Sequence, residues 1–132
     1  MKVVVIIPSY NEKDNTSEMI ETLAGVFSKI KDHKIFLLYV DGNSPDGTSI
    51  IIKKYQKKYN WLHLLEETKK EGLGTAYAQG MQYAMKELKA EWLMEFDADF
   101  QHPPKDIPKL IEQIDHGYDF VIASRYVKGG GI

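Results

Sequence analysis

The chain has 132 residues, the length of one domain with a buried core. Its apolar share of 43% and charged share of 27% are ordinary for a soluble globular protein, and a net charge of −2 gives no general electrostatic reason to bind nucleic acid. It contains no cysteine, which excludes disulfides and thiolate chemistry, and no apolar run approaches the ~20 residues of a membrane span. We therefore expect a single cytoplasmic domain over residues 1–132, with no nucleic-acid partner.

Buried strands and amphipathic helices alternate along the chain. Continuous apolar runs that end in turn formers predict strands, and apolar residues at helical spacing predict the helices between them. The first helix is predicted to begin at a capping box of Asn15 and Glu18, and Asp46 is predicted to cap the second. The third is predicted to begin near Gly74, and the fourth contains Ile107. The predicted strands are 2–7, 35–40, 61–65, 92–96 and 118–124.

Helical connections of this length predict an α/β fold, a mostly parallel sheet with helices on both faces. Ligands bind such sheets beyond the carboxyl ends of the strands. The loops predicted at those ends are 9–12, 41–46, 97–104 and the stretch from residue 125, all polar and rich in turn formers. The chemistry is therefore expected at one edge of the sheet. Because the chain stops just after a predicted strand, we expect the domain to be incomplete at its C-terminal end.

The acidic motif Asp97-Ala98-Asp99 is the strongest sign of chemistry. Two carboxylates with one residue between them, just past a buried strand, offer hard oxygen ligands that suit Mg²⁺ or Mn²⁺. Such an ion would neutralise a diphosphate. Taken alone, the motif is equally compatible with solvated turn aspartates that cap the helix after Pro104, because a lone acidic pair is a weak signal.

Four other segments accompany this motif. They are Ile7-Pro8-Ser9-Tyr10-Asn11-Glu12, the stretch from Val40-Asp41-Gly42 to Thr48, Gly72-Leu73-Gly74-Thr75-Ala76-Tyr77, and Ser124-Arg125-Tyr126. Together and in this order they resemble family 2 glycosyltransferases of the Rossmann-like GT-A fold, and most closely the dolichol- and polyprenol-phosphate mannosyltransferase branch. The resemblance covers essentially the whole chain, but only the donor-binding front of such enzymes.

The resemblance implies an activity and a set of site residues. The activity is inverting, Mg²⁺- or Mn²⁺-dependent transfer of mannose or glucose from a nucleoside diphosphate sugar, of the GDP-mannose or UDP-glucose type, to a polyprenyl or dolichyl phosphate at a membrane surface. Asp99 and Arg125 would act in catalysis, and Asp97, Asp99 and Gln101 would bind the metal. The implied donor-binding residues are Pro8, Tyr10, Glu12, Val40, Asp41, Asp97, Ala98, Asp99 and Arg125.

One position departs from the family pattern. Gly42 stands where the family usually has a second aspartate, which contacts the nucleoside. Either Asp41 takes over this contact, or backbone groups and Glu12 hold the base, because a glycine supplies no side-chain acceptor.

Several other features have a purely structural interpretation. Gly72 to Thr75 lacks the Gly-Lys-Ser/Thr of a P-loop and favours a closely packed helix start over a phosphate cradle. The run Lys53 to Lys58 indicates a solvated helix face or, for a lipid-linked acceptor, attraction to anionic headgroups that would hold the protein at the cytoplasmic membrane face. The histidines carry no predicted role; His102 is expected to pack beside Pro103, and the surface is expected to hold His33, His63 and His116.

Three other functions stay open. The chain could be a catalytically silent or incomplete nucleotide-sugar-binding module, or a family 2 transferase with a hydroxyl acceptor, whose catalytic base would lie beyond Ile132. A phosphatase with a nucleophilic aspartate is the third, although its acidic motif usually closes the first strand, whereas here it closes the fourth.

Overall fold

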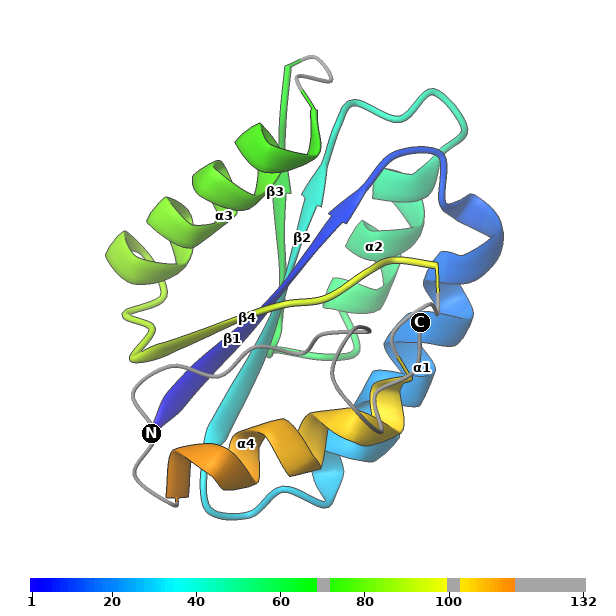
Figure 1. The fold of residues 1–132 in the computed structure, drawn as a ribbon. Helices are drawn as coiled ribbons and strands as arrows, with labels where there is room; N and C mark the ends of the chain where they lie inside the picture. The colour runs from blue at the N-terminus through cyan, green and yellow to red at the C-terminus, as the bar shows by residue number, and fades with distance from the viewer. Residues whose placement is uncertain (69–71, 100–102, 116–132) are drawn as a thin grey trace.

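Strands and helices alternate throughout the computed structural model, which describes residues 1–68, 72–99 and 103–115 (Figure 1). This confirms the predicted α/β alternation, while the strand predicted at 118–124 lies outside the described residues. The elements in chain order are β1 (Lys2–Ser9), α1 (Lys13–Ser28), β2 (Lys34–Asp41), α2 (Thr48–Gln56), β3 (Leu62–Glu66), α3 (Leu73–Lys86), β4 (Trp92–Glu95), the 3₁₀ turn η1 (Pro104–Asp106) and α4 (Ile107–Asp115).

Within the described part of the chain, all strand pairs are parallel and the order across the sheet is β3-β2-β1-β4. β1 pairs with β2 along its whole length, from Lys2 opposite Lys34 to Ser9 opposite Asp41. Because the two strands end in register, the loops that follow them leave the sheet side by side (Figure 1). β1 occupies a central place and its residues Val3 to Ile7 are almost fully buried, as its continuous apolar run predicts.

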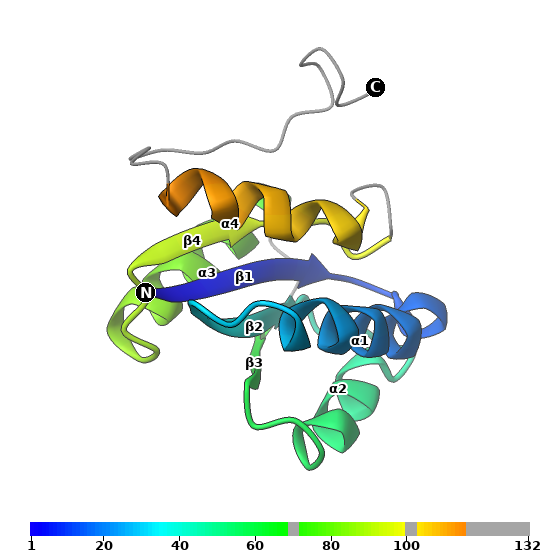
Figure 2. The same cartoon turned by 90° about the horizontal axis from the view of Figure 1, so that it is seen from below.

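The two faces of the sheet carry different helices, as predicted. Successive strand residues point to opposite faces, so Val3, Val5 and Ile7 pack with α1, α2 and α4, while Val4 and Ile6 pack with α3 (Figures 1 and 2). The first core holds most of the large buried side chains, and the second is thinner. None of the helices in the described ranges is long and apolar enough to span a bilayer.

Gly80 explains how α3 comes so close to the sheet. A Cβ atom at this position would lie 2.8 Å from Cγ2 of Ile6 and 2.9 Å from Cγ2 of Val40, closer than packed carbons approach. Ala76 and Ala84, one turn away on either side, are also buried small residues. A stripe of small side chains therefore lets α3 rest directly on β1 and β2.

Several local predictions are wrong in detail. α1 begins at Lys13 with Glu12 at its N-cap position, and no side-chain cap forms among the described residues; Asn15 instead donates its side-chain amide to the Glu12 carboxylate at 2.9 Å. α2 follows Gly47, whose φ of +93° suits a glycine, so Asp46 lies one residue before the N-cap position. His63 is half-buried against the ring of Phe36 rather than at the surface. His102 and His116 lie outside the described residues.

Candidate functional site

Three of the loops that the sequence singled out meet at the carboxyl edge of the sheet. Ser9 and Asp41 end β1 and β2 as register partners, and the backbone N–H of Gly42 donates to the carbonyl of Ser9 at 2.9 Å. On the other side of β1, the N–H of Phe96 donates to the carbonyl of Ile6, also at 2.9 Å. We call residues 9–13 and 41–48 the paired loops, and residues 96–99 the acidic turn. The fold thus brings both parts of the predicted site to one edge (Figure 1).

Asp41 lies at the base of the paired loops. It is only 1% exposed, and its carboxylate accepts hydrogen bonds from the Ser9 hydroxyl at 3.0 Å, from the Ser44 N–H at 3.0 Å and from the Ser44 hydroxyl at 2.6 Å. Hydrogen bonds to an ionised carboxylate are among the stronger ones in proteins. Asp41 therefore organises the loop, and a contact from it to a nucleoside stays a prediction.

The two loops are also tied to each other through three consecutive backbone amides. In each bond an N–H of the first loop donates to a side-chain oxygen of the second, and only residue types with a short polar side chain supply these oxygens. The pairs are Asn11 with Ser44 Oγ at 2.9 Å, Glu12 with Thr48 Oγ1 at 3.2 Å, and Lys13 with Asp46 Oδ2 at 3.1 Å. The backbone of the first loop is therefore held by the second. Ser44 and Thr48 are two residues of the site that no sequence pattern pointed to.

The predicted donor-binding residues of the first loop are differently exposed. Tyr10 is 38% exposed, while Pro8 and Glu12 are half-buried. Val40 is fully buried, with its side chain in the thinner core against α3. Beneath them lies the buried hydroxyl of Tyr39; burial, and then the negative charge of Glu12, raise its pKa well above the usual range, so it stays protonated.

The acidic turn is fixed by its apolar members. Phe96 and Ala98 are buried, whereas Asp97 is half-buried and Asp99 is exposed. From α3, the hydroxyl of Tyr77 donates to the carbonyl of Phe96 at 3.4 Å. Burial, followed by the charges of Asp97 and Glu95, raises the pKa of Tyr77. Buried and more open residues therefore alternate along the acidic turn.

These two carboxylates fit a hard divalent cation. No group of three or more His, Cys, Asp or Glu side chains able to hold a metal exists in residues 1–68, 72–99 and 103–115. Two oxygen ligands from the protein nevertheless suit Mg²⁺ or Mn²⁺, which keep waters and take oxygens from substrate phosphates. The helix-capping alternative does not hold at η1, because no side chain of the described chain caps it. Gln101 and Arg125 lie outside the described residues, so their predicted roles stay predictions.

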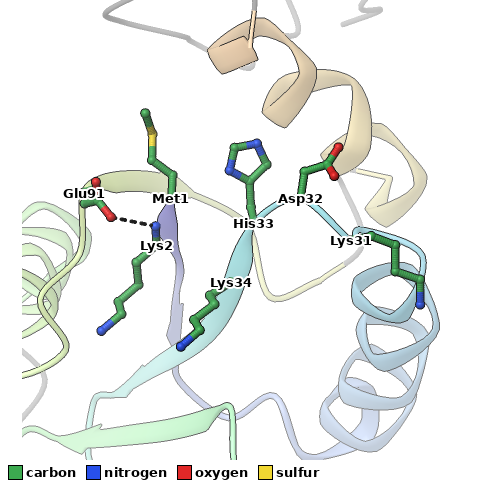
Figure 3. Close-up of a pocket in the computed structure, with 7 residues that line it drawn as sticks. All are labelled: Met1, Lys2, Lys31, Asp32, His33, Lys34 and Glu91. Atoms are coloured by element: carbon green, nitrogen blue, oxygen red, sulfur yellow. Dashed lines mark hydrogen bonds between the residues drawn. The ribbon is translucent and has the colours of Figure 1, made fainter.

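One hollow of the described surface lies away from this site. A cleft of about 370 Å³ opens at the amino ends of β1 and β2, across the sheet from the acidic turn (Figure 3). Its lining combines both signs of charge, and two of its backbone amides are already used, Lys2 with a Glu91 carboxylate oxygen at 3.1 Å and Lys34 with the Met1 carbonyl at 2.9 Å. Parallel sheets bind ligands at the opposite edge, so chemistry rather than volume identifies the site.

Comparison with known proteins agrees with this geometry. Residues 4–132 match the model of glycosyl transferase family 2, and the chain belongs to this family. It is 39% identical, over its full length, to dolichol-phosphate mannosyltransferase of Pyrococcus furiosus, of which it spans 35%. It is 37% identical, over 98% of its length, to undecaprenyl-phosphate mannosyltransferase of Micrococcus luteus, of which it spans 51%. The chain thus covers between a third and a half of these relatives.

Solved structures show the same fold. The mannosyltransferase PcManGT from Pyrobaculum calidifontis, in complex with GDP-Man and Mn²⁺, superposes on 79% of this chain with a TM-score of 0.65 and 28% identity, and the match covers 29% of that protein. S. aureus TarS 1-349, in complex with UDP-GlcNAc, superposes on 88% of this chain with a TM-score of 0.65 and 26% identity, covering 32% of that protein. The fold is therefore the GT-A glycosyltransferase fold.

Proposed function

We propose that this chain is the donor-binding part of a metal-dependent, inverting glycosyltransferase that moves a hexose, with mannose favoured, from a nucleoside diphosphate sugar to a polyprenyl phosphate. The observation that carries the proposal is the position of Asp97 and Asp99 at the same sheet edge as Tyr10 and Glu12, in a chain of glycosyl transferase family 2. An aromatic ring beside a carboxylate suits a nucleoside, and a pair of carboxylates suits the metal that accompanies a diphosphate.

Each half of the site has its own task. Tyr10 would stack on the base, and Glu12 would accept hydrogen bonds from the base or the ribose. Asp41 shapes this half from below, and the N–H of Gly42 is already donated to Ser9, which favours Glu12 for the polar contact to the nucleoside. Asp97 and Asp99 would hold Mg²⁺ or Mn²⁺, which when bound neutralises negative charge on the departing diphosphate.

The acceptor assignment rests on the relatives. Two of them, 39% and 37% identical to this chain, are named for dolichol phosphate and undecaprenyl phosphate. A phosphate oxygen is already anionic, so its attack on the sugar needs little help from a general base, and holding the two reactants in line is the main requirement. Two exposed lysines, Lys54 on α2 and Lys57 directly after it, would favour an anionic membrane surface. The proposal places Arg125 near the phosphates and Gln101 at the metal.

The test is titration calorimetry of GDP-mannose and UDP-glucose into the chain, with and without Mn²⁺. Asp99→Ala should weaken Mn²⁺-dependent donor binding by about 100-fold, because the ion contributes several kcal/mol to binding a diphosphate. Asp32→Ala is the matched control: it removes an exposed aspartate at the opposite edge and should leave donor binding unchanged. Undetectable binding of both donors by the wild type, or binding that ignores the metal, would contradict the proposed function.

A further inference from the structure

Asp46 joins the starts of two helices. Its Oδ1 atom accepts the backbone N–H of Thr48 at 3.0 Å and the Thr48 hydroxyl at 2.5 Å, which holds the beginning of α2. Its Oδ2 atom accepts the N–H of Lys13 at 3.1 Å, which holds the beginning of α1. One carboxylate therefore fixes the ends of both paired loops, although Asp46 was predicted only as a cap of the second helix.

The Thr48 hydroxyl connects Asp46 to the backbone of Glu12. A hydroxyl has one hydrogen to donate, and here it is donated to Asp46. The lone pairs of the same oxygen then face the N–H of Glu12, which donates to it at 3.2 Å. Asp46 therefore restrains the backbone at two successive residues. It restrains the Glu12 amide indirectly, through the Thr48 hydroxyl, and it accepts the Lys13 N–H directly.

The first loop needs such support because its backbone is not relaxed. Asn11 has a φ of +53°, in the left-handed region that non-glycine residues occupy at a cost of order 1 kcal/mol or more. Burial alone would raise the pKa of Asp46, but hydrogen bonds from Thr48 and Lys13, and the charge of Lys13, lower it below its usual value. The carboxylate is therefore ionised at neutral pH, when it is the strongest acceptor.

We propose that Asp46 is a positioning residue for the donor: through Thr48 and Lys13 it sets the orientation of Glu12 at the sheet edge. The inference rests on the proposed function, since it assigns Glu12 and Tyr10 to the nucleoside. Asp46 itself does not touch the donor. The alternative is an ordinary structural role, in which the same bonds stabilise the two helix starts and nothing more.

The experiment compares Asp46→Asn and Thr48→Val with two controls. Asn keeps the shape of the side chain but turns an amide N–H₂ toward the N–H of Lys13, and Val removes the hydroxyl of Thr48. Thr48→Ser restores that hydroxyl. Asp14→Asn removes a negative charge from the exposed first turn of α1, without the bonds that Asp46 makes.

Calorimetry with GDP-mannose and Mn²⁺ should show about 5- to 10-fold weaker binding for Asp46→Asn and Thr48→Val, at an unchanged number of sites. Asp46→Asn loses the bond from the Lys13 N–H, and Thr48→Val loses the two bonds of the hydroxyl, to Asp46 and from the Glu12 N–H. Hydrogen exchange should be faster at the amides of Glu12 and Lys13. Thr48→Ser and Asp14→Asn should behave as the wild type.

Each of the other outcomes rejects either this inference or the proposed function. A lower number of sites at unchanged affinity means that the bonds serve folding alone, and the inference fails. Faster exchange at Glu12 with unchanged affinity shows that the loop is held but does not position the donor, and the inference fails as well. If the wild type itself binds no nucleoside diphosphate sugar, the proposed function fails, and this inference fails with it.

Discussion

The paired loops and the acidic turn are two halves of one edge, held in different ways. In the paired loops, side-chain oxygens of Asp41, Ser44, Asp46 and Thr48 accept hydrogen bonds between 2.5 and 3.2 Å from both loops. In the acidic turn, burial of apolar residues anchors the backbone, and Asp99 stays exposed. The first half is therefore held by hydrogen bonds within the protein, while the second is the half that we propose to hold the metal. The same Asp→Asn change should therefore cost stability at the buried Asp41 and very little at the exposed Asp99.

The largest effect on stability is expected from Asp41→Asn. An amide nitrogen cannot accept the hydrogen bonds that the buried carboxylate accepts from Ser9 and Ser44, so the free energy of unfolding should fall by about 2–3 kcal/mol. Asp99→Asn, the same chemical change at an exposed position, should stay within about 0.5 kcal/mol of the wild type. Urea denaturation measures both. Equal losses in the two variants would remove the contrast between the halves.

A smaller effect is expected below the paired loops, at Gly80. The Cβ of Gly80→Ala would press on the branched side chains of Ile6 and Val40, and we expect a loss of about 1–2 kcal/mol. Gly25→Ala in α1 is the control, since a Cβ there meets nothing within 4 Å; it should stabilise the chain by about 0.5–1 kcal/mol. Thermal unfolding distinguishes the two. A stabilised Gly80→Ala variant would show that α3 does not pack on β1 and β2 as described.

The smallest effect is expected for the pH dependence of stability, and it involves His63 on β3, away from both halves. Burial lowers the pKa of His63 below its usual value of 6.5, so the unfolded chain binds the proton more readily than the folded one. Stability is then complete above pH 6.5 and declines as the pH falls through the pKa of the folded state. His63→Gln should flatten this decline by about a few tenths of a kcal/mol, because the half-exposed ring is screened by solvent. Unfolding at a series of pH values tests it, and a steeper decline in the variant would contradict it.

Local pattern was enough to predict the elements, but not their ends. The run from Lys2 to Ile7 predicts β1 because a buried parallel strand is apolar on both faces, and the structure extends it by two residues to Ser9. The capping box of Asn15 and Glu18 was wrong because tertiary hydrogen bonds to Lys13 and Glu12 fix an earlier helix start. Those bonds join residues 33 and 36 positions apart, a separation that no local spacing reveals.

The location of the candidate site was predictable from the sequence, but the tasks of several of its residues were not. Its edge followed from the strand order along the chain, since carboxyl ends of parallel strands meet. The tasks of Asp46 and Thr48 did not follow, because a cluster of turn formers is equally expected in any tight loop. The sequence predicts Tyr77 on the buried face of the third helix, but not its hydrogen bond to the Phe96 carbonyl, which depends on how α3 packs over the sheet.

The central claim is that the acidic turn and the paired loops form one donor and metal site. The most direct measurement is paramagnetic broadening of amide signals in the ¹⁵N-labelled chain, when Mn²⁺ is titrated in the presence of GDP-mannose and compared with Mg²⁺. The account predicts that signals of Asp97, Ala98 and Asp99 vanish first and those of residues 10–12 next, while signals around Asp32 and Glu91 persist. Strongest broadening at the opposite-edge cleft of Figure 3, or no difference between the edges, would contradict it.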